Sequence, residues 1–272
     1  MILQRPPGPA LRPFVSILWA KDASPAAPGH ERELILPKGA MHVAIRLRAK
    51  PLRLFASPGD VHGQVVGACV LNGVRLGAYA KENADSAASV GAMLRPGAAD
   101  LLSNTPAGAL AGRHTRLEDL WPAHTLADAC ERLEAARSLE HRLAILEDVL
   151  ASRLPALRGT DPLVVHALAR FDAGASVGDV VAESGFSHRH VVRVFTEAVG
   201  AAPKAYMRLG RFNRTLELLR GAEIVSLADV ATAAGYADQS HMTREFRDFA
   251  GMSPGRYLRT GCEWPHHVPV TP

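Results

Sequence analysis

Two periods of hydrophobic and polar residues follow one another along this chain, and the change falls near residue 115. Before it, apolar and polar residues alternate, most regularly over Met41–Arg48, where Val43, Ile45 and Leu47 share one face. A period of two is typical of a half-buried strand. We expect further strands in apolar runs bounded by Gly, Pro and Asn, at 14–19, 52–55, 64–71 and 74–79.

Beyond residue 115 the apolar positions recur every three to four residues, which predicts helices at 126–136 and 139–154. The second helix carries an apolar stripe of Leu143, Leu146, Val149 and Leu150. This stripe can pack on the strands or pair with a second subunit, and packing within the chain is the commoner outcome. Helical structure is also expected in the alanine-containing stretches 84–93 and 98–102.

One pattern occurs twice in the last third of the chain, first at Ser176–Arg208 and again at Ser226–Arg259. The early positions match at an offset of 50 and the later ones at an offset of 51, so the second copy has one extra residue within 237–240. A repeat whose single slip lies in a turn indicates one structural unit used twice.

Each copy predicts a helix, a turn and a second helix. Ser176 and Ser226 precede apolar runs and have Asp three residues later, a pattern that begins a helix. Gly185 and Gly235 supply the residue type that ends a helix with a positive φ. Such a unit is a helix-turn-helix, whose second helix can enter a DNA major groove.

The repeated motifs are a Gly-aromatic turn, Arg-x-Phe on the second helix, and Gly-x-x-Pro-x-x-Tyr after it. Their order in both copies, over residues 163–259, resembles the DNA-binding domain of AraC/XylS transcription regulators. The resemblance implies an all-α domain at 160–260 in which a long helix near 203–220 joins the two units. It implies double-stranded DNA as the partner, with both recognition helices directed toward successive major-groove faces.

The resemblance also places base- and phosphate-contacting residues at the start of each second helix. The predicted DNA-binding set is Ser187, His188, Arg189, His190, Val192, Arg193, Asp238, Gln239, Ser240, Thr243 and Arg244. Arg189 can form two hydrogen bonds to guanine, and Gln239 can read adenine. Contact with phosphate is the alternative for Gln239, whereas Arg193, repeated as Arg244, can contact phosphate or serve packing.

Aromatic residues of the repeat are predicted to be core rather than DNA contacts, because they stand at helical spacing beside glycine turns. They are Phe186, Phe195, Tyr206, Tyr236, Phe246 and Tyr257.

The N-terminal region also has a family resemblance. Its motifs Pro-x-Leu-x-Pro-Phe-Val-x-x-Leu-Trp at 9–19 and Leu-Pro-x-Gly at 36–39 are similar to sensor domains that accompany this DNA-binding module. That resemblance implies a cupin-like barrel and a small-molecule effector, but no particular ligand. His42, Arg46 and Arg48 share one strand face; in a cavity they would favour an anion, and otherwise they form a solvated face.

Catalytic and metal-binding patterns are missing from the sequence, so we expect neither an enzyme nor a cofactor. A metal-dependent cupin needs a clustered His-x-His, and His42 and His62 stand alone. The tail 261–272 carries Cys262, His266 and His267, but its prolines and terminal position favour a flexible segment over a metal site.

Composition changes this interpretation little. Three scattered cysteines argue against a disulfide framework, and neither a signal peptide nor a membrane-spanning run is recognisable, which favours a reduced cytoplasmic protein. The formal charge is +4, yet residues 160–272 hold 12 Lys and Arg against 12 Asp and Glu. The DNA-binding prediction therefore rests on the motifs and not on net charge.

Together these observations predict an α+β protein of two domains. Residues 1–155 form a β-rich, cupin-like sensor or dimerisation domain that ends in helices, and residues 160–260 form the double helix-turn-helix. The main hypothesis is a sequence-specific transcription regulator under an unknown signal. One alternative is a small-molecule or metal-binding cupin enzyme that carries a DNA-binding module. The other is a regulator without a ligand whose first domain only forms a homodimer.

Overall fold

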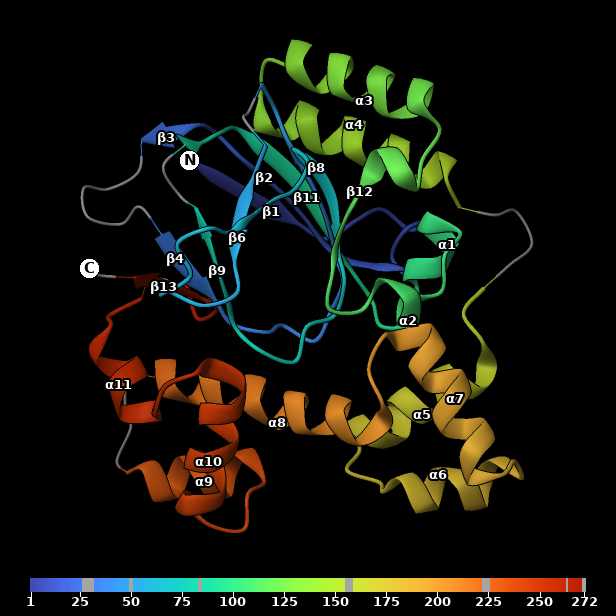
Figure 1. Cartoon of the computed structure of the whole chain (residues 1–272). Helices are drawn as coiled ribbons and strands as arrows, with labels where there is room; N and C mark the ends of the chain where they lie inside the picture. The colour runs from blue at the N-terminus through green and yellow to red at the C-terminus, as the bar shows by residue number, and fades with distance from the viewer. Residues whose placement is uncertain are drawn as a thin grey trace.

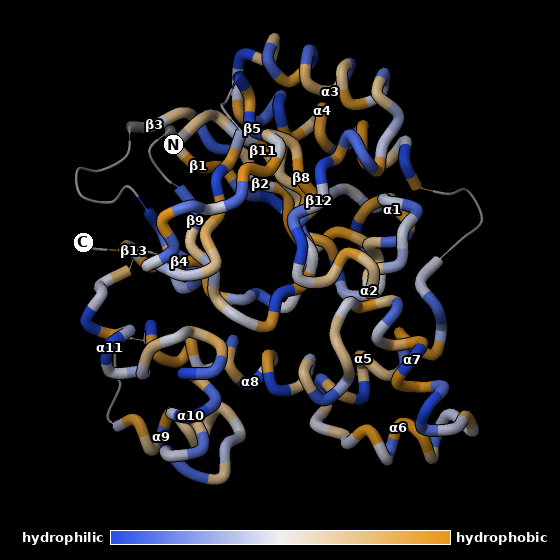
Figure 2. The backbone as a smooth tube through the Cα atoms, viewed as in Figure 1, coloured by the Kyte–Doolittle hydropathy of each residue, from blue (hydrophilic) through white to orange (hydrophobic). Residues whose placement is uncertain are grey.

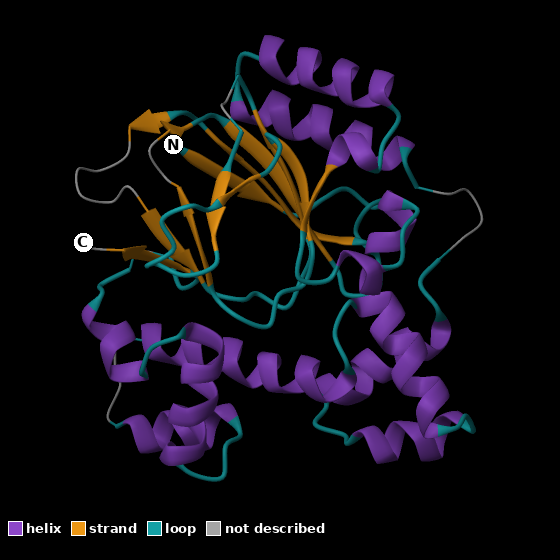
Figure 3. Ribbon diagram, in the orientation of Figure 1, coloured by secondary structure: helices purple, strands orange, loops and turns teal. Residues whose placement is uncertain are grey.

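The computed structural model describes residues 1–25, 32–48, 51–82, 85–154, 159–221, 226–262 and 264–270. The chain forms a β-rich part that is followed by a helical part (Figure 1), which confirms the predicted α+β class. Figure 3 shows the strands gathered in one half of the molecule, flanked on two sides by helices. The stretch 155–160, between the two predicted domains, falls mostly outside the described residues.

Two antiparallel sheets make up the β-rich part. The larger one has the order β1 (Ile2–Arg5), β2 (Val15–Lys21), β11 (Ser89–Leu94), β5 (His42–Arg46), β8 (Cys69–Asn72) and β12 (His114–Arg116). The smaller one has the order β13 (His267–Val270), β4 (Arg32–Ile35), β9 (Tyr79–Glu82), β6 (Arg53–Phe55) and β7 (Gln64–Val65). β3 (Ser24–Pro25) and β10 (Asp85–Ser86) form a separate pair.

Helices cover the outer face of the larger sheet. They are α3 (Ala123–Ala135) and α4 (Leu139–Ser152), preceded by α1 (Ala99–Ser103), α2 (Ala107–Leu110) and the 3-10 turn η1 (Leu117–Asp119). Leu143 and Leu146 of α4 share one buried cluster with Val43 and Ile45 of β5. The stripe of α4 therefore packs within the chain, as the sequence favoured.

Two sequence predictions in the β-rich part were wrong. Residues 74–79 were expected to be a strand, but β9 begins only at Tyr79. The stretch 84–93 was expected to be helical, but Ser89–Leu94 is the strand β11, between β2 and β5. Small residues hid its alternation: Gly91 lies directly under the indole of Trp19, where a Cβ atom would overlap the ring.

The helical part is built around α8 (Pro203–Arg220), which lies where the long helix was predicted. Before it come α5 (Pro162–Asp172), α6 (Val177–Ser184) and α7 (His188–Val199); after it come α9 (Leu227–Ala234), α10 (Gln239–Ala250) and α11 (Pro254–Arg259). Figure 1 shows α6 and α7 near one end of α8 and α9 and α10 near the other. Hydrophobic and hydrophilic residues alternate along these helices in Figure 2, as amphipathic helices require.

The predicted helix starts and stops are confirmed. The hydroxyl of Ser176 accepts a hydrogen bond from the backbone of Asp179, whose carboxylate accepts one in return from the backbone of Ser176. Ser226 accepts from Asp229 in the same way. Gly185 and Gly235 end α6 and α9 with φ angles of 71° and 86°, which favour glycine.

The tail was expected to be flexible, and the structure contradicts this. Residues His267–Val270 form β13, which pairs with β4 at the edge of the smaller sheet. Val268 is buried, and the Tyr257 hydroxyl donates to the carbonyl of Pro265 at 3.0 Å. Pro269 is compatible with this strand because an edge strand leaves some amide positions unused.

Over the described ranges, no helix is long and apolar enough to cross a membrane.

Candidate nucleic-acid interface

The second helix of each unit begins at a side-chain cap. The Ser187 hydroxyl accepts a hydrogen bond from the backbone of His190 at 3.3 Å, and the Asp238 carboxylate accepts one from the backbone of His241 at 2.7 Å. Ser187 and Asp238 were predicted to contact DNA, and both have this local role in addition. The caps fix where α7 and α10 start and therefore which residues stand in their first turns.

One face of α7 is buried and the other is open to solvent. Val191, Phe195 and Val199 pack with α5 and α6. On the opposite face His188, Arg189 and Arg193 are exposed and Val192 is half-buried. With Thr196 and Glu197 they line a shallow depression of about 560 Å³. The structure thus brings most of the predicted α7 residues together on one surface.

Helix α10 is arranged in the same way. It buries Met242, Phe246 and Phe249 against α8 and α9. Gln239, Ser240 and Arg244 are exposed and Thr243 is half-buried. All four belong to the predicted set, and they stand within the first two turns of the helix.

Two residues of the predicted α7 set have partners within the protein. The ring of His190 stacks on Phe186, with 4.7 Å between the ring centroids and 25° between their planes. Arg193 forms an ion pair of 2.9 Å with Glu197. Arg189 and Arg244 form no ion pair with any residue in the described ranges. The latter two guanidinium groups are therefore the readiest to contact DNA.

Phe186 was expected in the core, and this was wrong. Its side chain is 49% exposed, whereas Phe195, Tyr236, Phe246 and Tyr257 are buried and Tyr206 is half-buried. The reason is the length of the turn. One residue separates Gly185 from the cap Ser187, and two separate Gly235 from the cap Asp238. The turn with the extra residue is the one that places its aromatic residue, Tyr236, inward.

Sequence reasoning missed a buried acid on α10. The side chain of Glu245 is 4% exposed and lies 2.7 Å from Arg208 and 3.2 Å from Arg211, both on α8. Arg208 also pairs with Asp248 at 2.9 Å, and hydrogen bonding to Glu245 raises the pKa of Arg208. The signal was present in the repeat, where Glu245 matches Val194 at an offset of 51. This network fixes α10 on the long helix.

The two second helices are joined through the long helix α8. An 18-residue helix such as α8 is about 27 Å long. One turn of B-DNA repeats every ~34 Å, and helix-turn-helix dimers use this distance between half-sites. The helix that connects the two units is thus of the same order of length as one DNA turn.

Comparison with known proteins agrees with this geometry. A family model described as a helix-turn-helix domain matches residues 180–260, and another, described as a domain of unknown function, matches residues 3–116. Residues 180–260 are an AraC-type helix-turn-helix domain. The transcriptional activator NphR of Rhodococcus sp. is 33% identical over 120 residues, which cover 43% of this chain and 35% of NphR.

Two further proteins are similar to this chain. The uncharacterised HTH-type transcriptional regulator YbfI of Bacillus subtilis is 30% identical over 139 residues, 48% of this chain and 49% of YbfI. The crystal structure of ToxT from Vibrio cholerae overlaps 89% of this chain and 97% of its own, with 11% identity and a TM-score of 0.46. The chain spans about a third to a half of the length of the curated relatives it matches.

The three predicted effector residues do not share one face. Arg48 follows the end of β5 with a φ of 49°, and its side chain is 78% exposed and pairs with Glu134 at 3.1 Å. His42 lies among Lys38, Lys81 and His267, and burial lowers its pKa well below the usual value. The strand ends before Arg48, which explains the difference. Only His42 and Arg46 remain on the inner face of β5.

The tail residues considered for metal binding point to separate partners. His266 hydrogen-bonds Asn213 at 2.9 Å, and His267 pairs with Glu33 at 3.1 Å. No group of three or more His, Cys, Asp or Glu with metal-binding geometry occurs in the described part of the chain. Cys69 is buried as expected for a small apolar residue, and its sulfur lies 3.8 Å from that of Cys130.

Proposed function

We propose that this protein is a DNA-binding transcription regulator that reads one bipartite site with α7 and α10. The observation that carries the proposal is the repeated unit, presented twice from one long helix with an open polar face on each second helix. Relatives of the AraC-type domain named as transcriptional regulators support the same function. Because it would act on intracellular DNA, we place it in the cytoplasm.

In this proposal, Arg189 reads guanine in one half of the site and Gln239 reads adenine in the other. Both stand in the first turn of an exposed helix face, where side chains reach base edges. His188, Ser240, Thr243 and Arg244 contact neighbouring bases or phosphates. Arg208 and Arg211 do not take part, since Glu245 holds them on the protein.

The β-rich domain is placed to control both units. Leu34, Leu36 and Val268 of the β-rich domain share a buried cluster with Phe212 and Leu216 of α8. On the other side, Gly108 of α2 lies against the backbone of Thr196 and Glu197, at the end of α7. A change in the sheets can therefore reach both DNA-reading helices, which supports a sensor role for the first domain. Homodimerisation stays a prediction that sedimentation would test.

Selection of bound sequences from random duplex DNA tests the proposal. We expect a motif of two parts with centres about one helical turn apart. Arg189→Ala should lower the affinity by about 1–3 kcal/mol and relax one part, and Gln239→Ala should relax the other. Arg247→Ala is the matched control, because Arg247 is exposed on α10 outside the predicted set.

Two outcomes would count against this function. A bound pool without sequence preference would remove the base-reading roles of Arg189 and Gln239. Equal losses for Arg189→Ala and Arg247→Ala would show that charge alone attracts DNA. Repeating the selection at two salt concentrations separates these cases, since phosphate contacts weaken steeply with salt and base contacts do not.

A further inference from the structure

The inner surface of the β-rich domain is strongly polar on one side. Side chains alternate across each strand, so β4 directs Leu34 toward the helical domain and Glu33 toward the larger sheet. Glu33 pairs with Lys81 of β9 at 2.9 Å and with His267 of β13 at 3.1 Å. Lys38 Nζ lies 3.4 Å from the other nitrogen of His267. A connected set of charged groups thus lies between the sheets.

Cations outnumber carboxylates in this set. Lys81 and Arg46 lower the pKa of Lys21 of β2, and Glu33 raises it. For Lys38, Lys81 lowers the pKa and Glu33 raises it. Over the described residues, Glu33 is the single carboxylate that favours the charged forms of Lys21 and Lys38. Burial, with the neighbouring Lys81, lowers the pKa of Lys38 to about 8 and also lowers that of Lys21. An added negative charge would therefore stabilise both ammonium groups.

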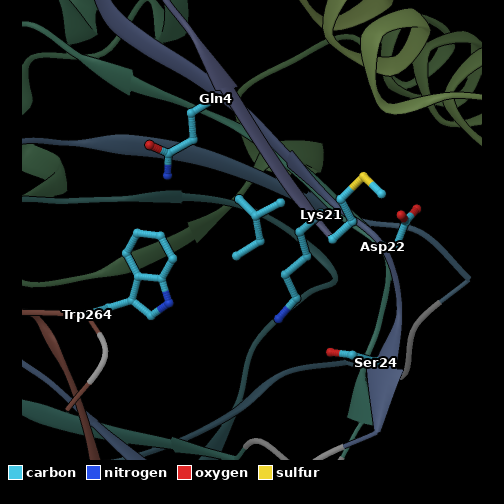
Figure 4. A pocket seen from close by; sticks show the side chains of 7 residues that line it. Gln4, Lys21, Asp22, Ser24 and Trp264 are labelled. Atoms are coloured by element: carbon cyan, nitrogen blue, oxygen red, sulfur yellow. The ribbon is translucent and has the colours of Figure 1, made fainter. Parts of the chain in front are cut away.

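A cavity of about 590 Å³ opens beside this set. Gln4, Lys21, Ser24 and Trp264 line it together with the apolar side chains of Met1 and Ile2. Figure 4 shows the ammonium group of Lys21 directed into the space between Trp264 and Ser24. The ammonium group of Lys21 forms no hydrogen bond or ion pair with any residue in the described ranges.

Other groups in and near the cavity are compatible with a negatively charged ligand. Asp22 also borders the cavity, but Arg142 holds its carboxylate at 3.2 Å. Deeper between the sheets, the Nδ1 atom of His42 is buried and has no hydrogen-bond partner among the described residues. Polar atoms buried without partners are rare in proteins, and a bound polar group is one way to satisfy them.

We propose that this cavity binds a small organic carboxylate, with its charged group on Lys21 and its apolar body against Trp264 and Ile2. The volume lies in the usual range of ligand pockets, about 300–1,000 Å³. The effector role of this ligand rests on the proposed regulator function, whereas the binding itself does not.

The strands beside the cavity connect it to the helical domain. β4 and β13 carry Glu33 and His267 on their inner face, next to the basic groups. Their outer face carries Leu34 and Val268, which pack in one cluster with Leu216 of α8. A carboxylate bound to Lys21 would change the charge balance around Glu33. A resulting shift of β4 and β13 would also move the helix that joins the two DNA-reading units.

Binding of benzoate and of octanoate to the purified full chain, each compared with its primary amide, tests the site. The amides have nearly the same shape without the charge. Isothermal calorimetry should show at least one carboxylate binding about tenfold more tightly than its amide, which corresponds to about 1.4 kcal/mol. Lys21→Met should remove this preference and Lys21→Arg should retain it. Lys204→Met is the control, because Lys204 is exposed on α8.

Equal affinities for carboxylate and amide would overturn the proposal, as would an unchanged preference in Lys21→Met or the absence of binding by either acid. Tryptophan fluorescence locates the site. A ligand in this cavity should change the fluorescence of the unmodified protein, and most of that change should be lost in Trp264→Phe. The DNA selection described above is performed without ligand. Sequence-specific DNA binding without carboxylate binding would leave the regulator function in place and reject only this site.

Discussion

The two helix-turn-helix units share a sequence pattern, and the molecule holds them in different ways. The first unit has a core of its own, in which Val164 and Phe171 of α5 pack on Val180 and Phe195. The second unit shares its core with the smaller sheet through Leu34 of β4 and Val268 of β13. The first unit also touches the β-rich domain, where α2 lies against the end of α7 and Gly97 lies beside Val164 of α5.

Single positions of the repeat account for this difference. Where the first unit has Val194, the second has Glu245, which two arginines of α8 bind. Where the first has an exposed Phe186, the second has a buried Tyr236. Repetition of a motif therefore conserves the local fold but not the attachment. The second unit is held by α8 and the smaller sheet, whereas the first is held by α5 and α2.

The largest expected effect compares the two aromatic positions. Tyr236→Ala should lower the free energy of unfolding by about 3 kcal/mol, because it removes a large buried side chain. Phe186→Ala should lower it by less than about 1 kcal/mol, since half of that side chain is already in solvent. Urea denaturation of both variants measures the difference. Similar losses would show that the shorter turn does not change the role of the position.

The next effect concerns the buried acid. Glu245→Ala should cost about 2–3 kcal/mol, because it leaves Arg211 half-buried without its partner carboxylate. The exposure of Arg208 keeps the loss below that of a fully buried pair. Val194→Ala at the matching position should cost about 1 kcal/mol. If the two variants lose equal stability by urea denaturation, the network does not distinguish the units.

Acid should loosen the second unit before the first. Burial lowers the pKa of His266 to about 3, against about 6.5 in an unfolded chain. The opened state therefore binds a proton that the folded state does not, so stability falls as pH decreases from about 6.5 toward 3. At pH 4.5 we expect the local free energy of unfolding at the junction of β13 and α8 to fall by an amount on the order of 2 kcal/mol.

Hydrogen exchange of β13 and α8, compared with α5–α7 at pH 7 and 4.5, measures this loss. His266→Asn should make the junction less sensitive to pH. The control His124→Asn changes an exposed histidine on α3 and should leave the sensitivity as it is. Equal loosening of both units at pH 4.5 would mean that other buried histidines control the acid response.

The smallest effect is expected at the ion pair on α7. Glu197→Gln should release Arg193 and tighten DNA binding about twofold, at a stability change below about 0.5 kcal/mol. The second unit has no equivalent gain, because Asp248 is held by Arg208. Glu183→Gln, which breaks an exposed pair with Arg170 away from the α7 face, is the control. Unchanged affinity by fluorescence anisotropy would show that Arg193 does not contact DNA.

Much of the helical domain was predictable because its signals are local. Caps such as Ser176 and glycines such as Gly185 act within a few residues, and the repeat doubled each observation. The slip of one residue even located the turn that buries Tyr236. Exposed faces of α7 and α10 followed from the same periodicity, which is why most predicted DNA-contacting residues lie on them.

The rest depended on contacts between distant residues. β11 was missed because Gly91 is dictated by Trp19 on another strand. The cavity was missed for a similar reason: Lys21 and Trp264, which both line it, lie far apart in the sequence, and only the fold brings them together. Arg48 was assigned to the face of His42 because alternation says nothing about where a strand ends. Local sequence patterns therefore predicted many of the helices and strands, whereas contacts between distant residues determine where the sites lie.

Strand β13 has a consequence for how the protein is made. Its residues pair with a strand that precedes them by more than 230 residues, so the edge of β4 stays open while the helical domain is being synthesised. Unpaired edges invite association with other chains during synthesis. A truncation before Trp264 should therefore reduce the soluble yield from cells, even though it removes no DNA-reading residue.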